Sequence, residues 1–154
     1  MKRLLSVLAV AAIVAGTAAS SASAATDVRL SRCAFQDHGK AFVDAGAPVT
    51  LTQGWADVKR GYVQDFLNAQ RTTLSIDGGP LVDASGNWGP IDSNNTTLWT
   101  YDTGRSLAKG ESMVVTFDIT VTRQVTGTDD AGNHVQFGPG SVFGGPIQCT
   151  IRAK

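Results

Sequence analysis

The clearest pattern along the chain is an alternation of apolar and polar residues in its second half. From Met113 to Val121 every odd-numbered residue is apolar, and threonines and one aspartate lie among the even-numbered ones. This period of two predicts a strand with one buried face. Apolar residues at 125, 135 and 137 flank a stretch rich in Gly, Asp and Asn, which predicts a hairpin. Alternation at 147–151 predicts a C-terminal strand.

Shorter apolar runs predict further strands at 28–30, 49–55, 73–76 and 98–101. The pair Asp77-Gly78 favours positive φ and predicts a tight hairpin into residues 81–82.

One segment has helical spacing instead, because Tyr62, Val63, Phe66 and Leu67 recur on one side of a helix. We expect a short helix over residues 58–70 that connects two sheets and buries this stripe in the core, with Asp57 as its cap.

About seven short strands separated by turn signals predict an all-β domain. Its composition agrees, since threonine and valine are abundant and the chain has a single glutamate. The expected architecture is an antiparallel β-sandwich, immunoglobulin-like, with Greek-key connections and the one short helix. A closed β-barrel is the alternative.

The N-terminal segment has the three parts of a secretory signal peptide. Met1–Arg3 carries positive charge, residues 4–16 are apolar, and Ala22–Ala24 supplies small residues for cleavage. We therefore expect a signal peptide at 1–24, of bacterial style, followed by one domain over 25–154. The apolar run is shorter than the roughly 20 residues that a membrane-spanning helix needs. The mature chain is thus expected to be secreted, without a transmembrane segment.

Cys33 and Cys149 are the two cysteines of the chain and lie near the two ends of the expected domain. An even number of cysteines in an exported protein predicts a disulfide, with two buried free thiols as the alternative. Only two histidines accompany them, and no C-x-x-C spacing is present. We therefore expect no metal site and no cofactor.

The charge balance and the histidines bear on two further classes of function, nucleic-acid binding and acid–base catalysis. The 13 basic side chains balance the 13 acidic ones, which gives no electrostatic footprint for nucleic acid. Histidines lie near carboxylates in Asp37-His38 and in the 129–134 loop, where Asp129 and Asp130 precede His134. Acid–base catalysis uses such pairs, but the chain has no G-x-S-x-G nucleophile motif, so turns are the preferred interpretation.

Two loops resemble calcium loops only in part. Residues 83–87 and 129–133 place oxygen-bearing side chains around a glycine, but the EF-hand order and its twelfth-position glutamate are missing. We expect turns there as well.

The aromatic residues Trp88, Trp99 and Tyr101 are the candidates for ligand binding, Trp88 above all because it lies in a glycine- and proline-flanked loop. Edge packing is the alternative for Trp88. The expected function is that of a non-catalytic exported β-sandwich, a binding or cell-envelope-associated module for an extracellular glycan or protein. The alternatives are a small secreted hydrolase that uses loop carboxylates with His38 or His134, and a protease-inhibitor-like domain.

Overall fold

The computed structural model describes residues 24–129 and 131–154. The expected signal peptide therefore lies, apart from Ala24, outside the described residues. About half of the described residues are in strands and 15% are in helices, including the short 3-10 helix η1 (Ser85–Asn87). The strands form several sheets, and within the described residues none of these closes into a barrel. The prediction of a mostly β fold is confirmed, and the alternative of a closed barrel is wrong.

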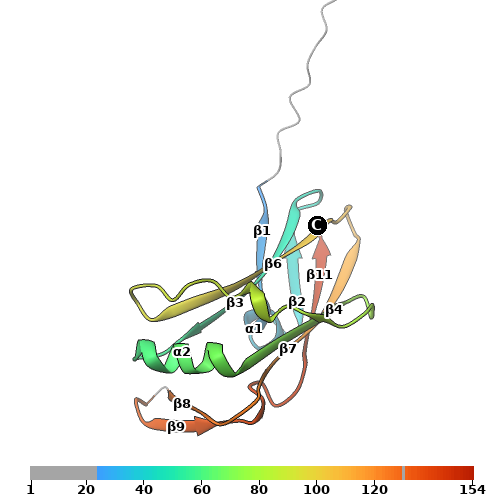
Figure 1. The fold of residues 1–154 in the computed structure, drawn as a ribbon. Coiled ribbons are helices and arrows are strands. Elements are labelled where there is room, and N and C mark those ends of the chain that lie inside the picture. The colour runs from blue at the N-terminus through green and yellow to red at the C-terminus, as the bar shows by residue number, and fades with distance from the viewer. Residues whose placement is uncertain (1–23, 130) are drawn as a thin grey trace, which may run out of the picture.

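The first sheet has three strands in the order β1-β3-β6 (Figure 1). They are β1 (Thr26–Arg29), β3 (Pro48–Ala56) and β6 (Thr96–Ser106). β1 runs parallel to β3, whereas β3 and β6 are antiparallel. β6 continues well beyond the short strand expected at 98–101.

The second sheet has the order β2-β11-β7-β4-β5, and β10 adds to the end of β7. Its strands are β2 (Lys40–Val43), β11 (Ile147–Ala153), β7 (Ser112–Val121), β4 (Gln70–Ile76), β5 (Val82–Asp83) and β10 (Gly140–Ser141). A separate hairpin is formed by β8 (Val125–Thr128) and β9 (His134–Phe137), as the sequence predicted.

Two parallel pairs depart from the purely antiparallel sheets that the sequence predicted. β1 pairs with β3, and β2 pairs with β11, in both cases at a sheet edge. The chain between β1 and β2 turns through α1 (Leu30–Phe35), and the two strands enter different sheets. Alternation predicts which face of a strand is buried, but it carries no information on strand direction.

The core lies between the inner faces of the two sheets. Every odd-numbered residue from Met113 to Val121 is buried, which confirms the predicted register of β7. The ring of Phe117 packs at 4.9 Å from the ring of Trp99, which comes from β6 in the other sheet. Side chains of both sheets thus share one buried cluster.

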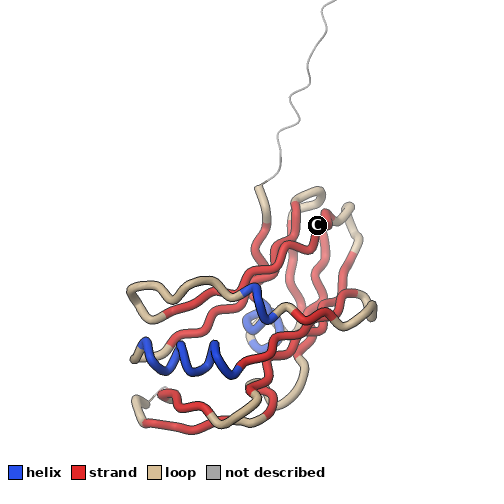
Figure 2. The backbone as a smooth tube through the Cα atoms, in the orientation of Figure 1, coloured by secondary structure: helices blue, strands red, loops and turns tan. Residues whose placement is uncertain are grey.

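The helices are short, as Figure 2 shows. α2 (Arg60–Ala69) joins β3 to β4 and so connects the two sheets, as predicted. Val63 and Phe66 are buried, whereas Tyr62 and Leu67 are only half-buried.

The predicted cap of α2 is wrong. Lys59 occupies the N-cap position, two residues after Asp57, and it makes no side-chain cap. The Asp57 carboxylate instead accepts hydrogen bonds at 3.0 Å from both the backbone N–H and the hydroxyl of Thr128. Asp57 therefore holds the β8–β9 hairpin and does not cap the helix.

Leu30 was expected in a strand, and the structure places it at the start of α1. Leu30 and Cys33, three residues apart, are the buried residues of this single-sided helix. A helix of six residues is too short for its period to be recognised in the sequence.

Candidate functional site

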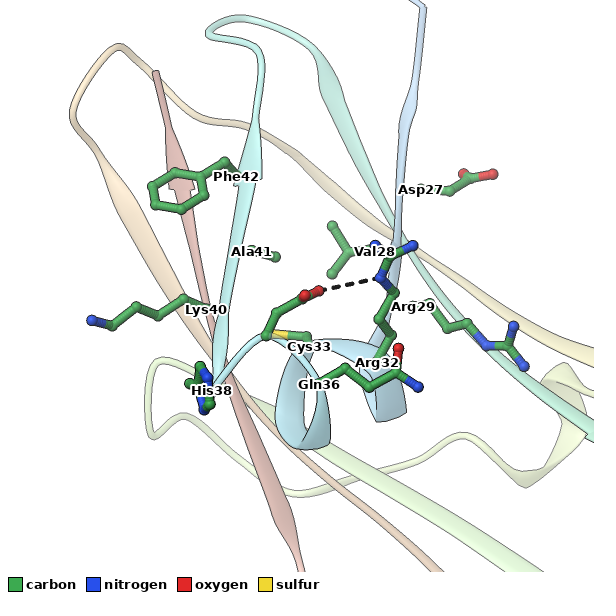
Figure 3. A pocket seen from close by; sticks show the side chains of 11 residues that line it. Asp27, Val28, Arg29, Arg32, Cys33, Gln36, His38, Lys40, Ala41 and Phe42 are labelled. Atoms are coloured by element: carbon green, nitrogen blue, oxygen red, sulfur yellow. Dashed lines mark ion pairs between the residues drawn. The ribbon is translucent and has the colours of Figure 1, made fainter.

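An open pocket of about 740 Å³ lies between β1, α1 and β2, and we call it the edge groove (Figure 3). Ligand pockets usually occupy about 300 to 1,000 Å³. The edge groove is lined by Asp27, Val28, Arg29, Arg32, Cys33, Gln36, Asp37, His38, Lys40, Ala41 and Phe42. A smaller neighbouring pocket shares three of these residues and adds Ser31 and Phe35.

The disulfide predicted from the sequence is present at this site. Cys33 of α1 is bonded to Cys149 of β11, with Cα atoms 5.8 Å apart and a separation of 116 positions in the sequence. Both cysteines are buried. The bond attaches α1 to the second sheet, while Val28 of β1 is buried beside the same helix and belongs to the first sheet. The base of the edge groove is thereby fixed to both sheets.

Two lining residues of the edge groove form an ion pair. Arg32 Nε is 3.4 Å from a carboxylate oxygen of Asp37, and a dashed line marks this pair in Figure 3. Both side chains are substantially exposed, so this pair contributes little stability and can exchange its partners for those of a ligand.

The two long walls of the edge groove are sheet edges, since β1 ends the first sheet and β2 ends the second. β2 pairs with β11, and at the two ends of this pairing the carbonyls of Gly39, just before β2, and of Val43 accept hydrogen bonds from the N–H groups of Thr150 and Lys154, at 2.8 and 3.1 Å. Because backbone groups alternate in direction along a strand, those of Phe42 and the carbonyl of Lys40 point away from β11. An edge of this kind presents N–H and C=O groups without a partner strand.

Exposed aromatic rings and cations surround this edge. Phe42 is 57% exposed and Phe35 is 59% exposed. The Lys154 ammonium lies 5.9 Å from the centre of the Phe42 ring. Within the described residues, Arg29, Lys40 and Lys154 form none of the five ion pairs.

The aromatic residues singled out in the sequence lie elsewhere. Trp99 is fully buried, so its ring has no surface to offer a ligand. Tyr101, which stacks on it at 5.9 Å, is half-buried. Trp88 forms a β-bridge with Trp99, and its indole N–H donates to the Thr72 hydroxyl at 3.0 Å. The structure thus brings the three candidates together, but none of them lines the edge groove.

Sequence reasoning missed the edge groove because it predicted neither β2 nor α1. Phe42 is an apolar residue between Ala41 and Val43, so the run 41–43 has no alternation to mark an exposed face. The available signal was the pair of phenylalanines, Phe35 and Phe42, on either side of the charged stretch that contains Asp37 and Lys40.

The two histidines lie on different elements. His38 has a φ of 53° and lines the edge groove, whereas the Nδ1 atom of His134 is 2.9 Å from the Tyr62 hydroxyl. Asp129 accepts hydrogen bonds from Ala131 and Asn133 within its own loop. The bonds from the Asn133 backbone and side chain lower the pKa of Asp129. Asp130 lies outside the described residues.

The loop at 83–87 also has an aspartate that accepts hydrogen bonds from its own loop, since Asp83 accepts them from the backbone N–H and the hydroxyl of Ser85. Over residues 24–129 and 131–154, no three His, Cys, Asp or Glu side chains gather as a metal site would require.

Comparisons with protein-family models, with curated proteins and with solved structures gave no match. In the part of the chain that the structure describes, no helix has the length and apolar character needed to cross a bilayer.

Proposed function

We propose that this chain is an exported, non-catalytic β-sandwich of the immunoglobulin-like type that binds an extracellular ligand in the edge groove. The signal-like N-terminal sequence and the Cys33–Cys149 disulfide support export, since disulfides form and persist in oxidising compartments. The Trp99–Phe117 contact between the inner faces of the two sheets supports the sandwich.

The edge groove is the main observation that supports ligand binding. Its volume is that of a ligand site, and charged, amide and aromatic side chains converge on it from three elements. The disulfide at its base holds α1 against β11. A site fixed in this way loses less conformational entropy when a ligand binds than a mobile loop would.

The hydrolase alternative finds less support in these contacts. His134 is hydrogen-bonded to Tyr62, and within the described residues no hydrogen bond or ion pair joins a histidine to a carboxylate. The hydrolase and the protease-inhibitor alternatives remain predictions of the sequence alone.

A pair of tryptophan substitutions tests the site. In Ala41→Trp the indole fills the edge groove, because Ala41 lines it. In the matched control Thr100→Trp the same ring is added to the outer face of the first sheet, where the exposed Thr100 follows the buried Trp99 on β6, two strands from β1. Both exported variants and the wild type are applied to the same peptide and glycan arrays.

We expect at least one array ligand to bind the wild type and Thr100→Trp and to be lost with Ala41→Trp, while both variants keep the circular dichroism spectrum of the wild type. If every ligand that binds is retained by Ala41→Trp, the edge groove is not the binding site.

A further inference from the structure

We propose that the occupant of the edge groove is an extended acidic peptide segment of a partner protein, which adds as a strand to the free edge of β2. This inference rests on the proposed binding function and names its ligand. A peptide strand that extends a sheet gains affinity from its main-chain hydrogen bonds and specificity from its alternate side chains.

The backbone of β2 has hydrogen-bonding groups on its free edge that a peptide strand can pair with. One edge of β2 is already occupied, since β2 pairs with β11 over its whole length. The other edge faces the groove with the N–H and C=O of Phe42 and the C=O of Lys40. An added strand pairs with these groups, which a glycan or a lipid headgroup does not reproduce with the same spacing.

The charges beside this edge specify an acidic segment. Asp37 is already paired with Arg32, whereas Lys40 forms no ion pair within the described residues. The other carboxylate of the groove lining, Asp27, points away from β2, to the far side of β1 (Figure 3). On the outer face Arg152 is the β11 partner of Phe42, and Lys154 lies over the Phe42 ring. A strand next to β2 would place its outward side chains beside these cations.

The two faces of β2 specify the alternation of the peptide. Lys40 and Phe42 project outward, whereas Ala41 and Val43 project toward the interior, where Val43 is buried. A neighbouring strand continues both faces, so its inward side chains meet the apolar floor around Val28 and its outward ones meet the cations. We therefore infer a segment in which apolar and acidic residues alternate.

An anionic membrane surface also attracts cations flanked by exposed phenylalanines. It makes no use of an unpaired strand edge, so the backbone of β2 favours the peptide, and the experiment includes vesicles as a separate arm.

The probe is a fluorescein-labelled peptide of alternating valine and glutamate, blocked at both ends and about six residues long, the usual length of a strand. It is titrated with the exported full chain, and binding is measured by fluorescence anisotropy. One control peptide carries lysine in place of glutamate. A second keeps the glutamates and is N-methylated at alternate backbone nitrogens on its pairing edge, so that it cannot donate to β2.

We expect the acidic peptide to bind at least about tenfold more tightly than the lysine peptide, because charge complementarity discriminates between partners. Binding should weaken as salt is raised. The N-methylated peptide, which has the same charge, should lose binding.

Variants test the same contacts from the protein side. Phe42→Pro removes an N–H that points away from β11, whereas Phe42→Ala removes the ring and keeps the N–H. Phe42→Pro should bind the acidic peptide about tenfold more weakly than Phe42→Ala, since it lacks a pairing donor. If the proline variant does not fold, the N-methylated peptide makes the same comparison from the ligand side.

A charge reversal distinguishes an interaction of the peptide with Lys40 from an effect of the net charge of the whole protein. Lys40→Glu should weaken binding about fivefold, whereas the matched reversal Lys59→Glu, just before α2 and outside the groove lining, should leave it unchanged.

Three results overturn the inference: equal binding of the acidic and N-methylated peptides, binding of neither the acidic nor the lysine peptide, or binding to phosphatidylglycerol vesicles without binding of the acidic peptide. If the peptide fails while Ala41→Trp still abolishes an array ligand, the edge groove binds another class of molecule and the proposed function stands. If Ala41→Trp has no effect either, both proposals fail.

Discussion

The indole of Trp88 makes two specific contacts with the body of the protein. Its N–H donates to the Thr72 hydroxyl at 3.0 Å, and its ring meets the ring of Phe66 edge-on with centroids 5.3 Å apart. Thr72 and Phe66 are both fully buried. A loop residue with such contacts lowers the free energy of the folded state, and Trp88 is itself partly buried against the core.

We therefore expect Trp88→Ala to destabilise the protein by about 3 kcal/mol, through lost packing and the loss of the hydrogen bond to the Thr72 hydroxyl, which keeps its own bond to Gln70. Trp88→Phe keeps a ring against Phe66 and should lose about 1 kcal/mol, the contribution of the hydrogen bond. Urea unfolding of both variants gives these values. An unchanged urea midpoint for Trp88→Ala would contradict this stabilising role and favour the ligand-binding role that the sequence predicted for Trp88.

At the scale of the element, β7 is the central strand of the second sheet, with β11 on one side and β4 on the other. Phe117→Ala should cost about 3 to 5 kcal/mol, because the buried ring contacts Trp99. Thr120→Ala, on the opposite face, should change stability by no more than about 0.5 kcal/mol. Thermal melts compare the two, and similar losses would contradict the assigned faces of the strand.

Asp57 provides a test of how the β8–β9 hairpin is attached. Removing its carboxylate in Asp57→Ala leaves the partly buried N–H and hydroxyl of Thr128 without this acceptor. Amide hydrogen exchange should then accelerate in residues 125–128, while the amides of α2 keep their protection. Faster exchange confined to the first turn of α2 would instead show that Asp57 caps the helix.

The elements that sequence alone predicted are those whose local pattern matches their environment. β7, β11 and β3 each bury one face, so their alternation was sufficient to find them. α1 was missed because six residues cover less than two turns. The cap of α2 was misassigned because the Asp57 carboxylate has a partner, Thr128, that is 71 residues away in the sequence.

At the scale of the whole molecule, the candidate site depends on which edges remain free after the strands have paired. The edge groove exists because β1 and β2 end different sheets while α1 holds them close together. No local pattern encodes that arrangement, so the sequence directed attention to Trp88, Trp99 and Tyr101. The one long-range contact that could be predicted was the Cys33–Cys149 pair, because the chain contains no other cysteine.

This disulfide links the N-terminal α1 to the C-terminal β11, so its loss should affect the molecule as a unit. Closing a loop of 116 residues restricts the unfolded chain, and removing such a bond from a small secreted domain costs about 2 to 5 kcal/mol. Cys33→Ala should therefore lower the urea midpoint by a corresponding amount, and Cys33→Ala/Cys149→Ala should lose little more than the single variant, since either change removes the whole bond. Reduction of the wild type should add the mass of two hydrogen atoms and shift its midpoint toward that of the double variant. An intact mass that does not change on reduction would contradict the bond, and a double variant as stable as the wild type would show that packing of Leu30 and β11 alone holds the two ends together.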